Sequence, residues 1–234
     1  MVELLKKLKD IAKNEGFLHI PFRLFSSFKN RVIKNYYKIN YGFENAWFGL
    51  RPYVYGLKHC KLGKNFYAER YFRLEIITKH GSNNYSPICY IGKNVRVSDF
   101  THIGCCHKLI IGNNVLIGSK VIITDHGHGA YSGSNQSSPS EIPNERDLFF
   151  DAVKIGDNVF IGDNVVILPG VQIGSGVIIA ANTVITSRTV IPNNVIVGGS
   201  PLKILKSYNE LTKSWEKYDN TGYEVINKVD GSEG

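Results

Sequence analysis

The feature that most constrains the fold of this chain is a six-residue repeat in its second half. From Ile155 to Leu202 the residues divide into consecutive units, which read IGDNVF, IGDNVV, ILPGVQ, IGSGVI, IAANTV, ITSRTV, IPNNVI and VGGSPL. Each unit begins with Ile or Val, its second residue is usually small, and its fifth is usually Val or Thr. This period excludes an amphipathic helix, because the apolar positions of a helix recur about every three to four residues.

A period of six fits a short strand followed by a turn, with three units forming one triangular coil. We expect the branched side chain at the first position to point inward and to stack on its equivalent in the next coil. Gly or Asn in the turns allows the backbone to take positive φ at the corners. A single coil cannot bury its apolar face, so the coils must stack. The sequence therefore predicts an all-β solenoid, a left-handed parallel β-helix.

The same pattern occurs earlier in the chain, and its interruptions indicate the domain organisation. The units IGKNVR, VSDFTH and IGCCHK, followed by IGNNVL, IGSKVI and ITDHGH, precede a long break in phase. We predict a β-helix domain over residues 46–206, with an inserted loop at 129–152 and a shorter excursion at 80–87. The residues from Lys203 onward look polar and partly helical, and we assign 207–234 to a C-terminal tail.

Residues 1–45 are predicted to form an N-terminal helical segment. Pro21 opens its second helical stretch, and the first stretch has apolar residues at helical spacing, namely Leu4, Leu5, Leu8 and Ile11. Charged residues interrupt every apolar run, so we expect neither a signal peptide nor a membrane span. Two interpretations remain open: a helical cap that packs on the rest of the protein, or a basic amphipathic surface that associates peripherally with a membrane.

The chain is basic, with a formal net charge of +8 over 234 residues. This balance suits an anionic partner such as a nucleotide, a CoA-type cofactor, nucleic acid or an acidic membrane surface, although a basic protein needs no such partner. The four cysteines form no C-x-x-C pair, which argues against a zinc site. We expect these cysteines to be reduced and semi-buried, as in a cytoplasmic protein.

The strongest chemical signal is the segment ITDHGHGAY, residues 123–131, where the repeat ends and the long loop begins. His126 and His128 lie two residues apart in a short extended stretch, so we expect them on the same side of it. A histidine at the mouth of a cleft is a good general base because its ordinary pKa is near neutral. The same pattern is also compatible with a metal-binding pair or with two histidines that only make structural hydrogen bonds.

Residues 60–206 resemble the hexapeptide-repeat acyltransferases, which include galactoside, maltose and xenobiotic O-acetyltransferases. Within this group they most resemble the bacterial acetyltransferases encoded with capsule and O-antigen polysaccharide genes. The resemblance rests on IGNNVLIGSKVIITDHGHG, on the loop and repeat SSPSEIPNERDLFFDAVKIGDNVF, and on VGGSPLKIL. It implies an acetyl-CoA-dependent O-acetyltransferase acting on a sugar of a surface polysaccharide or its precursor. It further implies a homotrimer with the active site between neighbouring subunits, with no metal and no nucleic-acid partner.

The resemblance places the catalytic histidine at His126, which would take the proton from the acceptor as it attacks the acetyl-CoA thioester. In the galactoside-type enzymes an acidic residue from the preceding coil supports this histidine, and Cys106 occupies that position here. Asp125 could orient the imidazole, contact the substrate, or act only in the turn. Arginine and phenylalanine in the long loop would close the cleft against the next subunit. The residues expected to bind substrate are Asp125, His128, Arg146 and Phe149.

The resemblance also implies a set of contacts to acetyl-CoA. Phe160 replaces a frequent Trp that borders the acetyl-CoA channel. Small residues of a later coil would line the pantetheine arm, and lysines after the last repeat would meet the phosphates of CoA. The expected contacts are Phe160, Ala180, Ala181, Thr186, Lys203 and Lys206.

Three other classes of protein share the predicted fold. An N-acetyltransferase acting on a nucleotide-linked amino sugar would use the same donor and the same histidine. A non-catalytic β-helix scaffold would only assemble complexes, and the DHGH motif and the basic pair after the last repeat argue against it. A γ-carbonic-anhydrase-like metalloenzyme would need three histidines spread across a trimer interface.

Overall fold

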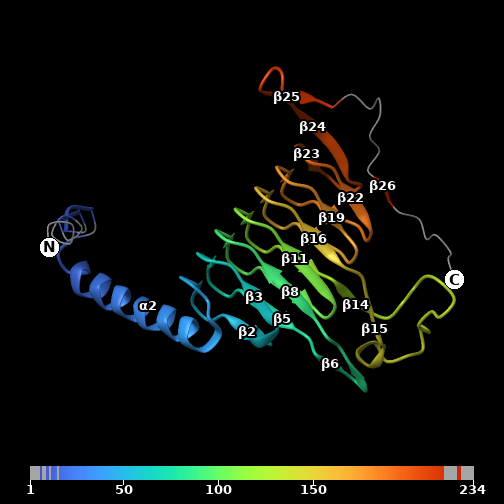
Figure 1. The fold of residues 1–234 in the computed structure, drawn as a ribbon, viewed down its shortest axis with the longest axis horizontal. Coiled ribbons are helices and arrows are strands. Elements are labelled where there is room, and N and C mark those ends of the chain that lie inside the picture. Colours follow the sequence, from blue (N-terminus) through green and yellow to red (C-terminus); the bar gives the residue numbers. More distant parts are fainter. Residues whose placement is uncertain (1–5, 7–8, 11, 15, 219–225, 228–234) are drawn as a thin grey trace. The chain divides into compact units, whose positions relative to one another are not determined.

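The computed structural model describes residues 6, 9–10, 12–14, 16–218 and 226–227 (Figure 1). The apolar residues that predicted the first helical stretch, Leu4, Leu5, Leu8 and Ile11, lie outside the described residues. The chain divides into two compact units, Met1–Trp47 and Phe48–Gly234. The predicted boundary at residue 45 is therefore close to the division between the units.

The first unit contains helix α2, His19–Tyr41, which begins two residues before Pro21. Proline is tolerated there because the first N–H groups of a helix have no partner within the helix. The helix ends at Gly42, which has a φ of 71° in the left-handed region and whose N–H donates to the Lys38 carbonyl. Among the described residues, no helix is long and apolar enough to cross a membrane.

The second unit is a parallel β-helix whose strands form three sheets, here named A, B and C (Figure 1). Sheet A contains β1 Trp47–Phe48, β4 Tyr67–Ala68, β9 Arg96–Val97, β12 Leu116–Ile117, β17 Phe160–Ile161, β20 Ile178–Ile179 and β23 Val195–Gly198. Sheet B contains β2 Tyr53–Tyr55, β5 Arg73–Ile76, β10 His102–Cys105, β13 Ile122–Thr124, β18 Val166–Ile167 and β21 Val184–Ile185. Sheet C contains β3 Cys60–Leu62, β8 Ile88–Ile91, β11 Lys108–Ile111, β16 Val153–Ile155, β19 Gln172–Ile173, β22 Thr189–Ile191 and the antiparallel β26 Ile226–Asn227.

The core contains the branched residues that open the six-residue units, the valines at the fifth position and the phenylalanines of the first coils. In sheet B the opening residues pair in register from strand to strand and have no exposed surface, as in the ladder Ile103, Ile123, Ile167 and Ile185. The corners use Asn in the left-handed region, where its short polar side chain is tolerated. Successive asparagines also bond to each other, for example Asn94 Nδ2 to Asn114 Oδ1 at 2.9 Å. The predicted β-helix is confirmed, with the same residues in the same roles.

Both predicted excursions leave the solenoid at the corner between sheets B and C. The first contains the short hairpin β6 Lys79–His80 and β7 Asn83–Asn84. The second contains β14 His126–His128, the 3-10 turn η2 Pro143–Glu145, and β15 Leu148–Phe150, which pairs antiparallel with β14. The two excursions meet, because Asn83 Nδ2 donates to Asp147 Oδ1 at 2.6 Å. The B–C corner is thus the place where side chains outside the repeat accumulate.

The segment after the last repeat differs from the prediction of a partly helical tail. Strand β24, Lys203–Asn209, pairs antiparallel with β23, and β25, Ser214–Lys217, pairs with β24. The predicted domain boundary at residue 206 therefore falls inside a strand. The physical reason is that the last coil of a solenoid leaves a row of unpaired backbone groups, and an added antiparallel strand satisfies them.

Candidate active site

The candidate site begins where β13 ends and the chain leaves the solenoid. Thr124 fixes the turn locally, since its hydroxyl donates to the His126 carbonyl at 2.8 Å and accepts from the His126 N–H at 3.2 Å. Beyond the turn, β14 is held by its antiparallel pairing with β15. The imidazole of His126 is therefore carried on a backbone that is bonded on both sides of the turn.

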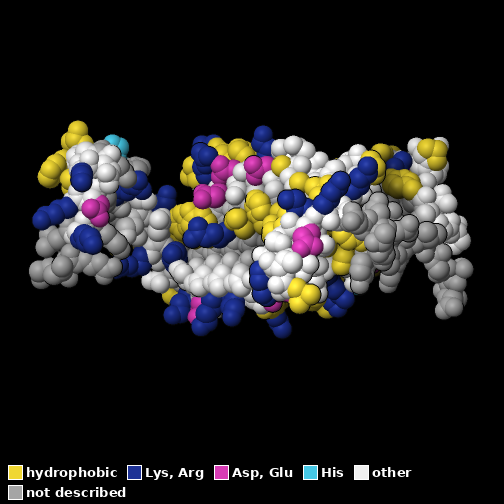
Figure 2. All heavy atoms as spheres, turned by 90° about the horizontal axis from the view of Figure 1, so that it is seen from above, with side chains coloured by type: hydrophobic (Ala, Val, Ile, Leu, Met, Phe, Trp, Pro, Cys, Tyr) yellow, Lys and Arg dark blue, Asp and Glu magenta, His cyan; other side chains and the backbone are white. Residues whose placement is uncertain are grey.

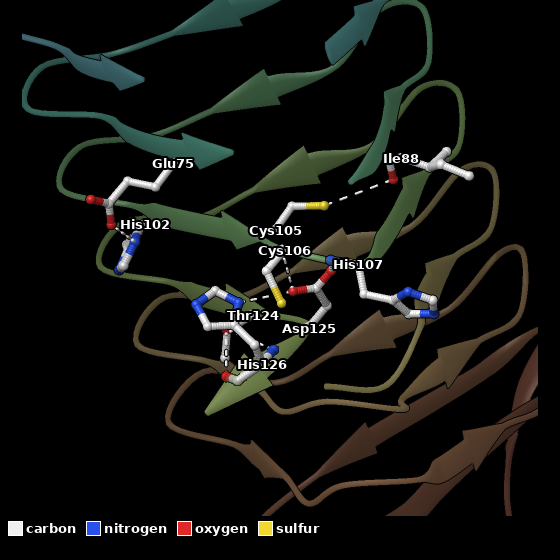
Figure 3. Close-up of polar contacts among 9 residues, drawn as sticks. All are labelled: Glu75, Ile88, His102, Cys105, Cys106, His107, Thr124, Asp125 and His126. Carbon is white, nitrogen blue, oxygen red and sulfur yellow. Dashed lines mark hydrogen bonds and ion pairs between the residues drawn. The ribbon is translucent and has the colours of Figure 1, made fainter. Parts of the chain in front are cut away.

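The fully buried carboxylate of Asp125 lies beside the imidazole of His126 and is hydrogen-bonded to it (Figure 3). Its Oδ1 accepts from His126 Nδ1 at 2.9 Å and from the Cys106 N–H at 2.8 Å, and its Oδ2 accepts from the His107 N–H at 2.9 Å. Burial alone raises the pKa of the Asp125 carboxyl, but these hydrogen bonds to its ionised form outweigh burial and leave the pKa below its ordinary value. Asp125 is therefore an anion at neutral pH.

This arrangement decides which nitrogen of His126 is free. A carboxylate can only accept hydrogen bonds, so Nδ1 carries the proton in the neutral ring and Nε2 presents its lone pair. The side chain of His126 keeps 12% of its surface exposed. Asp125 also stabilises the imidazolium that forms when Nε2 takes a proton. The pair can act as a general base.

The prediction of Asp125 as a substrate-binding residue is not supported, because its side chain has no exposed surface and both oxygens are occupied by protein donors. Of the roles left open by the sequence, the geometry favours orienting the imidazole. The carboxylate that contacts the His126 imidazole thus comes from the neighbouring residue and not from the preceding coil. Cys106 supplies backbone and thiol contacts to Asp125, and burial raises the pKa of its thiol well above the ordinary value.

Cys106, Asp125 and His126 could also be considered as metal ligands, since one ligand atom from each lies within 4.8 Å of the others. The chemistry of these atoms disfavours the idea. A metal binds a thiolate, so Cys106 would have to lose its proton next to the Asp125 carboxylate. A metal would also compete for Asp125 oxygens that already accept hydrogen bonds from backbone N–H groups and from the imidazole.

His128 lies on the exposed side of β14, next to the first excursion. Its ring is 5.0 Å from the ring of His80 in an edge-to-face arrangement. Burial lowers the pKa of His128, and the nearby His80 and His126 lower it further. Its predicted substrate contact stays a prediction, and His80 is a neighbour that the sequence analysis did not single out.

Arg146 and Phe149 lie within the returning part of the long loop. Arg146 Nη1 donates to the Tyr131 hydroxyl at 2.8 Å, and Nη2 donates to the Glu141 carbonyl at 3.0 Å. The Arg188 guanidinium lies over the Phe149 ring, with its central carbon 5.7 Å from the centre of that ring. Within one chain these contacts hold the loop in shape, so the predicted closure against a neighbouring subunit stays a prediction.

The residues predicted to contact acetyl-CoA fall on sheet A and on two corners. Phe160 is 44% exposed and lies in an outward row of sheet A, after Tyr67, Arg96 and Leu116. From Phe160 the row continues in register through Ile178 and Ile196 to Lys206 on β24. Lys203 pairs with Gly198 on the same two strands. Between Leu116 and Ile196 the row is therefore an apolar strip, and it ends near two lysines. The corner residues are Ala180 and Ala181, which follow β20, and Thr186, which follows β21.

One chain does not bring this strip and His126 together. His126 leaves the B–C corner, whereas Phe160 and Lys206 lie on sheet A, the face of a triangular prism opposite that corner. Thr186 is the exception, because it follows a strand of sheet B at the same corner as His126. A site containing all the predicted residues requires a second copy of the chain.

A polar pair that was not predicted from the sequence lies beside His126 on sheet B. His102 Nε2 lies 2.9 Å from Glu75 Oε2, and both side chains point outward from neighbouring strands (Figure 3). Burial lowers the pKa of His102, as does the positive charge of Arg73, while Glu75 opposes both. The pair can be recognised once the register of β5 and β10 is known, because outward-facing positions on successive coils are then neighbours.

The repeats match two family models. Residues 152–187 match the model described as bacterial transferase hexapeptide (six repeats), and residues 108–128 match the hexapeptide repeat of succinyl-transferase. WbbJ from Escherichia coli, provisionally named a lipopolysaccharide biosynthesis O-acetyl transferase, is 46% identical over 131 residues, which are 56% of this chain and 66% of WbbJ. The match thus spans just under two thirds of that relative's length.

Solved structures of AntD, an N-acyltransferase from Bacillus cereus, have the same fold. A mutant of AntD with dTDP and coenzyme A has a TM-score of 0.54 at 18% identity and covers 76% of this chain and 90% of its own. AntD with dTDP and 3-hydroxybutyryl-CoA has a TM-score of 0.50 at 17% identity, covering 69% of this chain and 79% of its own. The predicted resemblance to hexapeptide-repeat acyltransferases is confirmed.

Proposed function

We propose that this chain, whose repeats are those of the hexapeptide-repeat acyltransferases, is an acetyl-CoA-dependent O-acetyltransferase. Its acceptor is a sugar hydroxyl of a bacterial surface polysaccharide or its precursor. The observation that carries the proposal is the Asp125–His126 pair, in which a buried carboxylate fixes Nδ1 and leaves Nε2 free as a base. The relationship to WbbJ supports the class of acceptor.

The reaction follows from the position of that nitrogen. Nε2 of His126 takes the proton of the acceptor hydroxyl while its oxygen attacks the thioester carbonyl of acetyl-CoA. The tetrahedral oxyanion collapses by breaking the carbon–sulfur bond, and the leaving thiolate takes the proton from the imidazolium. The products are the sugar acetate and free CoA, and His126 returns to its neutral form. Asp125 keeps its negative charge throughout and stabilises the imidazolium between the two proton transfers.

The donor site of the proposal uses the strip on sheet A. The apolar row from Phe160 suits the pantetheine arm, and Lys203 and Lys206 suit the phosphates of CoA. Ala180 and Ala181 leave room for the arm at the next corner. No metal takes part in the proposed reaction.

A homotrimer is part of this proposal because the donor strip and His126 lie on opposite sides of one prism. Packing sheet A of one copy beside the B–C corner of the next would complete the site. Arg146 and Phe149 would then stand at the junction, on the loop that begins with His126. Sedimentation of the purified protein should give three times the chain mass, and a monomer with full activity would contradict this part.

We also propose that helix α2 rests on an anionic membrane surface. The residues between Phe17 and Phe43 include five Lys or Arg and no Asp or Glu. One stripe of the helix consists of apolar side chains that are each more than half exposed, Phe25, Phe28, Val32, Tyr36 and Ile39. Basic and apolar faces on one helix are typical of interfacial binding. Figure 2 shows basic side chains far outnumbering acidic ones on the visible face of the N-terminal unit.

Sedimentation with vesicles tests the membrane proposal. Wild-type protein should bind vesicles of phosphatidylcholine with phosphatidylglycerol, and binding should weaken with salt. The double variant Phe25→Asp, Phe28→Asp should lose binding, whereas Tyr90→Asp on the β-helix should not. Equal binding to neutral vesicles by all three proteins would contradict an interfacial role for α2.

The cytoplasm is the proposed location. All four cysteines are free thiols, and Cys60 Sγ lies 3.5 Å from Cys89 Sγ without a disulfide between them. Neighbouring reduced thiols suit a reducing compartment. They are also more deeply buried than the semi-buried cysteines predicted from the sequence.

An acceptor screen tests the function. Acetyl-CoA consumption is measured with a panel of sugars and sugar nucleotides, and the product is treated with mild alkali. The expected product is an ester, from which mild alkali removes the acetyl group. A stable amide would favour the alternative, an N-acetyltransferase acting on a nucleotide-linked amino sugar. A melting temperature that acetyl-CoA does not raise at saturation would favour a non-catalytic scaffold.

A further inference from the structure

The outer face of sheet B is polar and aromatic in its first strands and apolar in its last strands, and His126 lies beside the polar part. One outward row runs in register through Tyr53, Arg73 and His102, and then continues with the apolar Ile122, Val166 and Val184. A second outward row contains Tyr55, Glu75, Gly104 and Thr124. Aromatic and charged side chains are therefore confined to the first three strands of the sheet, β2, β5 and β10.

Gly104 joins this surface to the proposed base. A Cβ at Gly104 would lie 3.0 Å from Cε1 of His126 and 3.7 Å from Nε2 of His102. The His126 ring thus lies over the glycine, and the two imidazoles approach the same point on β10. In Figure 3, His102 and Glu75 lie on the side of His126 away from Asp125. The surface is continuous with the side of the imidazole that faces the reacting groups.

The polar groups next to His126 are held in fixed positions. Glu75 accepts from Arg73 Nη2 at 2.8 Å and pairs with Arg73 Nε at 2.7 Å and with His102 Nε2 at 2.9 Å. Because the carboxylate only accepts, Nε2 of neutral His102 carries the proton and Nδ1 remains an acceptor. The side chains of Arg73, Glu75 and His102 keep 52%, 19% and 34% of their surface exposed. They offer a preorganised set of donors and acceptors.

Two exposed aromatic rings follow in the next coil. Tyr53 and Tyr55 are each 56% exposed, and the Arg73 guanidinium lies 5.4 Å from the centre of the Tyr53 ring. The C–H face of a sugar ring packs on an aromatic ring, while its hydroxyls bond to planar polar groups beside it. Neighbouring strands lie about 4.8 Å apart, so β10 to β2 spans about 10 Å. This span is close to the length of a disaccharide.

We propose that β2, β5 and β10 carry an acceptor-binding surface and that the acceptor is a saccharide of at least two sugar residues. The acetylated residue contacts His126, His102 and Glu75, and the next residue packs on Tyr53 and Tyr55. This inference rests on the proposed function and adds the length of the acceptor to it. It assigns His102 and Glu75 to acceptor binding and leaves proton transfer to His126.

Matched sugar pairs test the length of the acceptor. Rates of acetyl transfer are compared for glucose with maltose, galactose with lactose, and N-acetylglucosamine with chitobiose. The ratio of kcat/KM for disaccharide over monosaccharide should be about tenfold in the wild type, as for one aromatic contact. The double variant Tyr53→Ala, Tyr55→Ala should bring the ratio close to one. Tyr90→Ala, an equally simple change on sheet C, should leave the ratio as it is.

A second variant separates the two parts of the surface. Glu75→Gln removes the charge that holds Arg73 and His102, so KM should rise about tenfold for monosaccharide and disaccharide alike, with KM for acetyl-CoA unchanged. A lower kcat with an unchanged acceptor KM would contradict the binding role of this group.

Other outcomes would also count against the acceptor-binding surface. Equal use of both members of every pair, or a double variant that keeps the wild-type ratio, would overturn the inference and leave the acetyltransferase in place. A double variant that loses its trimeric mass would show that a second copy of the chain covers the tyrosines, and would also overturn it. Acetyl transfer to none of the sugars would count against the proposed function and the inference together.

Discussion

The regular coils from Ile155 to Leu202 and the broken coil around residues 123–152 begin from the same repeat and end with different properties. In the regular coils most corners carry Asn or Gly in the left-handed region, and the inward positions are aliphatic except for Thr183 and Thr189. In the broken coil the strand end is followed by a buried carboxylate. A buried charge is costly without partners. Asp125 is accommodated because two backbone N–H groups and an imidazole face it.

Stability and chemistry therefore come from separate parts of this fold. Regular coils give rigidity because each repeats the contacts of the one before. The broken coil carries residues that do not recur in the other coils, such as Asp125 and His126. Its backbone is held in place by the regular coils on either side. Substitutions in the two regions should therefore affect different measurements.

The largest expected effect is on turnover in the break. His126→Ala should lower kcat by about 10²–10⁴-fold, because general-base catalysis is worth that much. Its melting temperature and the shift given by acetyl-CoA should stay as in the wild type. His128→Ala is the matched control on the same strand, and it should affect the acceptor KM more than kcat. Wild-type turnover by His126→Ala would remove this residue from the mechanism.

The next effect is on stability in the regular coils. Ile185→Ala should lower the free energy of unfolding by about 2–5 kcal/mol, because it leaves a cavity in a fully buried ladder. Val184→Ala, the outward neighbour on the same strand, should cost far less. Urea unfolding measures both, and kcat per folded protein should be unchanged for Ile185→Ala. Equal losses for the two variants would contradict the assignment of the inward ladder.

A smaller effect on turnover is expected from the orienting residue. Asp125→Asn should lower kcat by about 10–100-fold, the value of one hydrogen bond to a charged group. Steady-state rates are normalised to folded protein, since the Asn amide would also face a backbone N–H. A variant with wild-type kcat would show that the His126 imidazole needs no hydrogen bond to the Asp125 carboxylate for catalysis.

The smallest expected effect is a dependence of stability on pH in acid. The pKa of Asp125 is below its ordinary value in the folded protein. Its contribution is therefore present above the unfolded pKa, about 3.9, and is lost as pH falls through the folded value. The melting temperature of the wild type should drop more steeply below pH 4 than that of Asp125→Asn. Parallel curves would contradict the depressed pKa.

The repeat was enough to predict the solenoid and its two excursions, because a period of six leaves few other folds. The role of His126 was predicted from the resemblance to the hexapeptide-repeat acyltransferases and not from the repeat alone. It could not predict the strands β24 and β25, since they form only where an exposed sheet edge already exists. The orienting role of Asp125 depends on N–H groups of the preceding coil, which have no signature in the sequence. His102 and Glu75 become neighbours only once the register of β5 and β10 is known.

The central claim is that the break leaves Nε2 of His126 as the free base. Ring nitrogen chemical shifts of uniformly ¹⁵N-labelled protein at neutral pH report this directly, with His126→Ala used to assign the signals. The account predicts a protonated Nδ1 and an unprotonated Nε2 for His126, with this preference lost in Asp125→Asn. A wild-type ring protonated at Nε2, with Nδ1 bare, would contradict it.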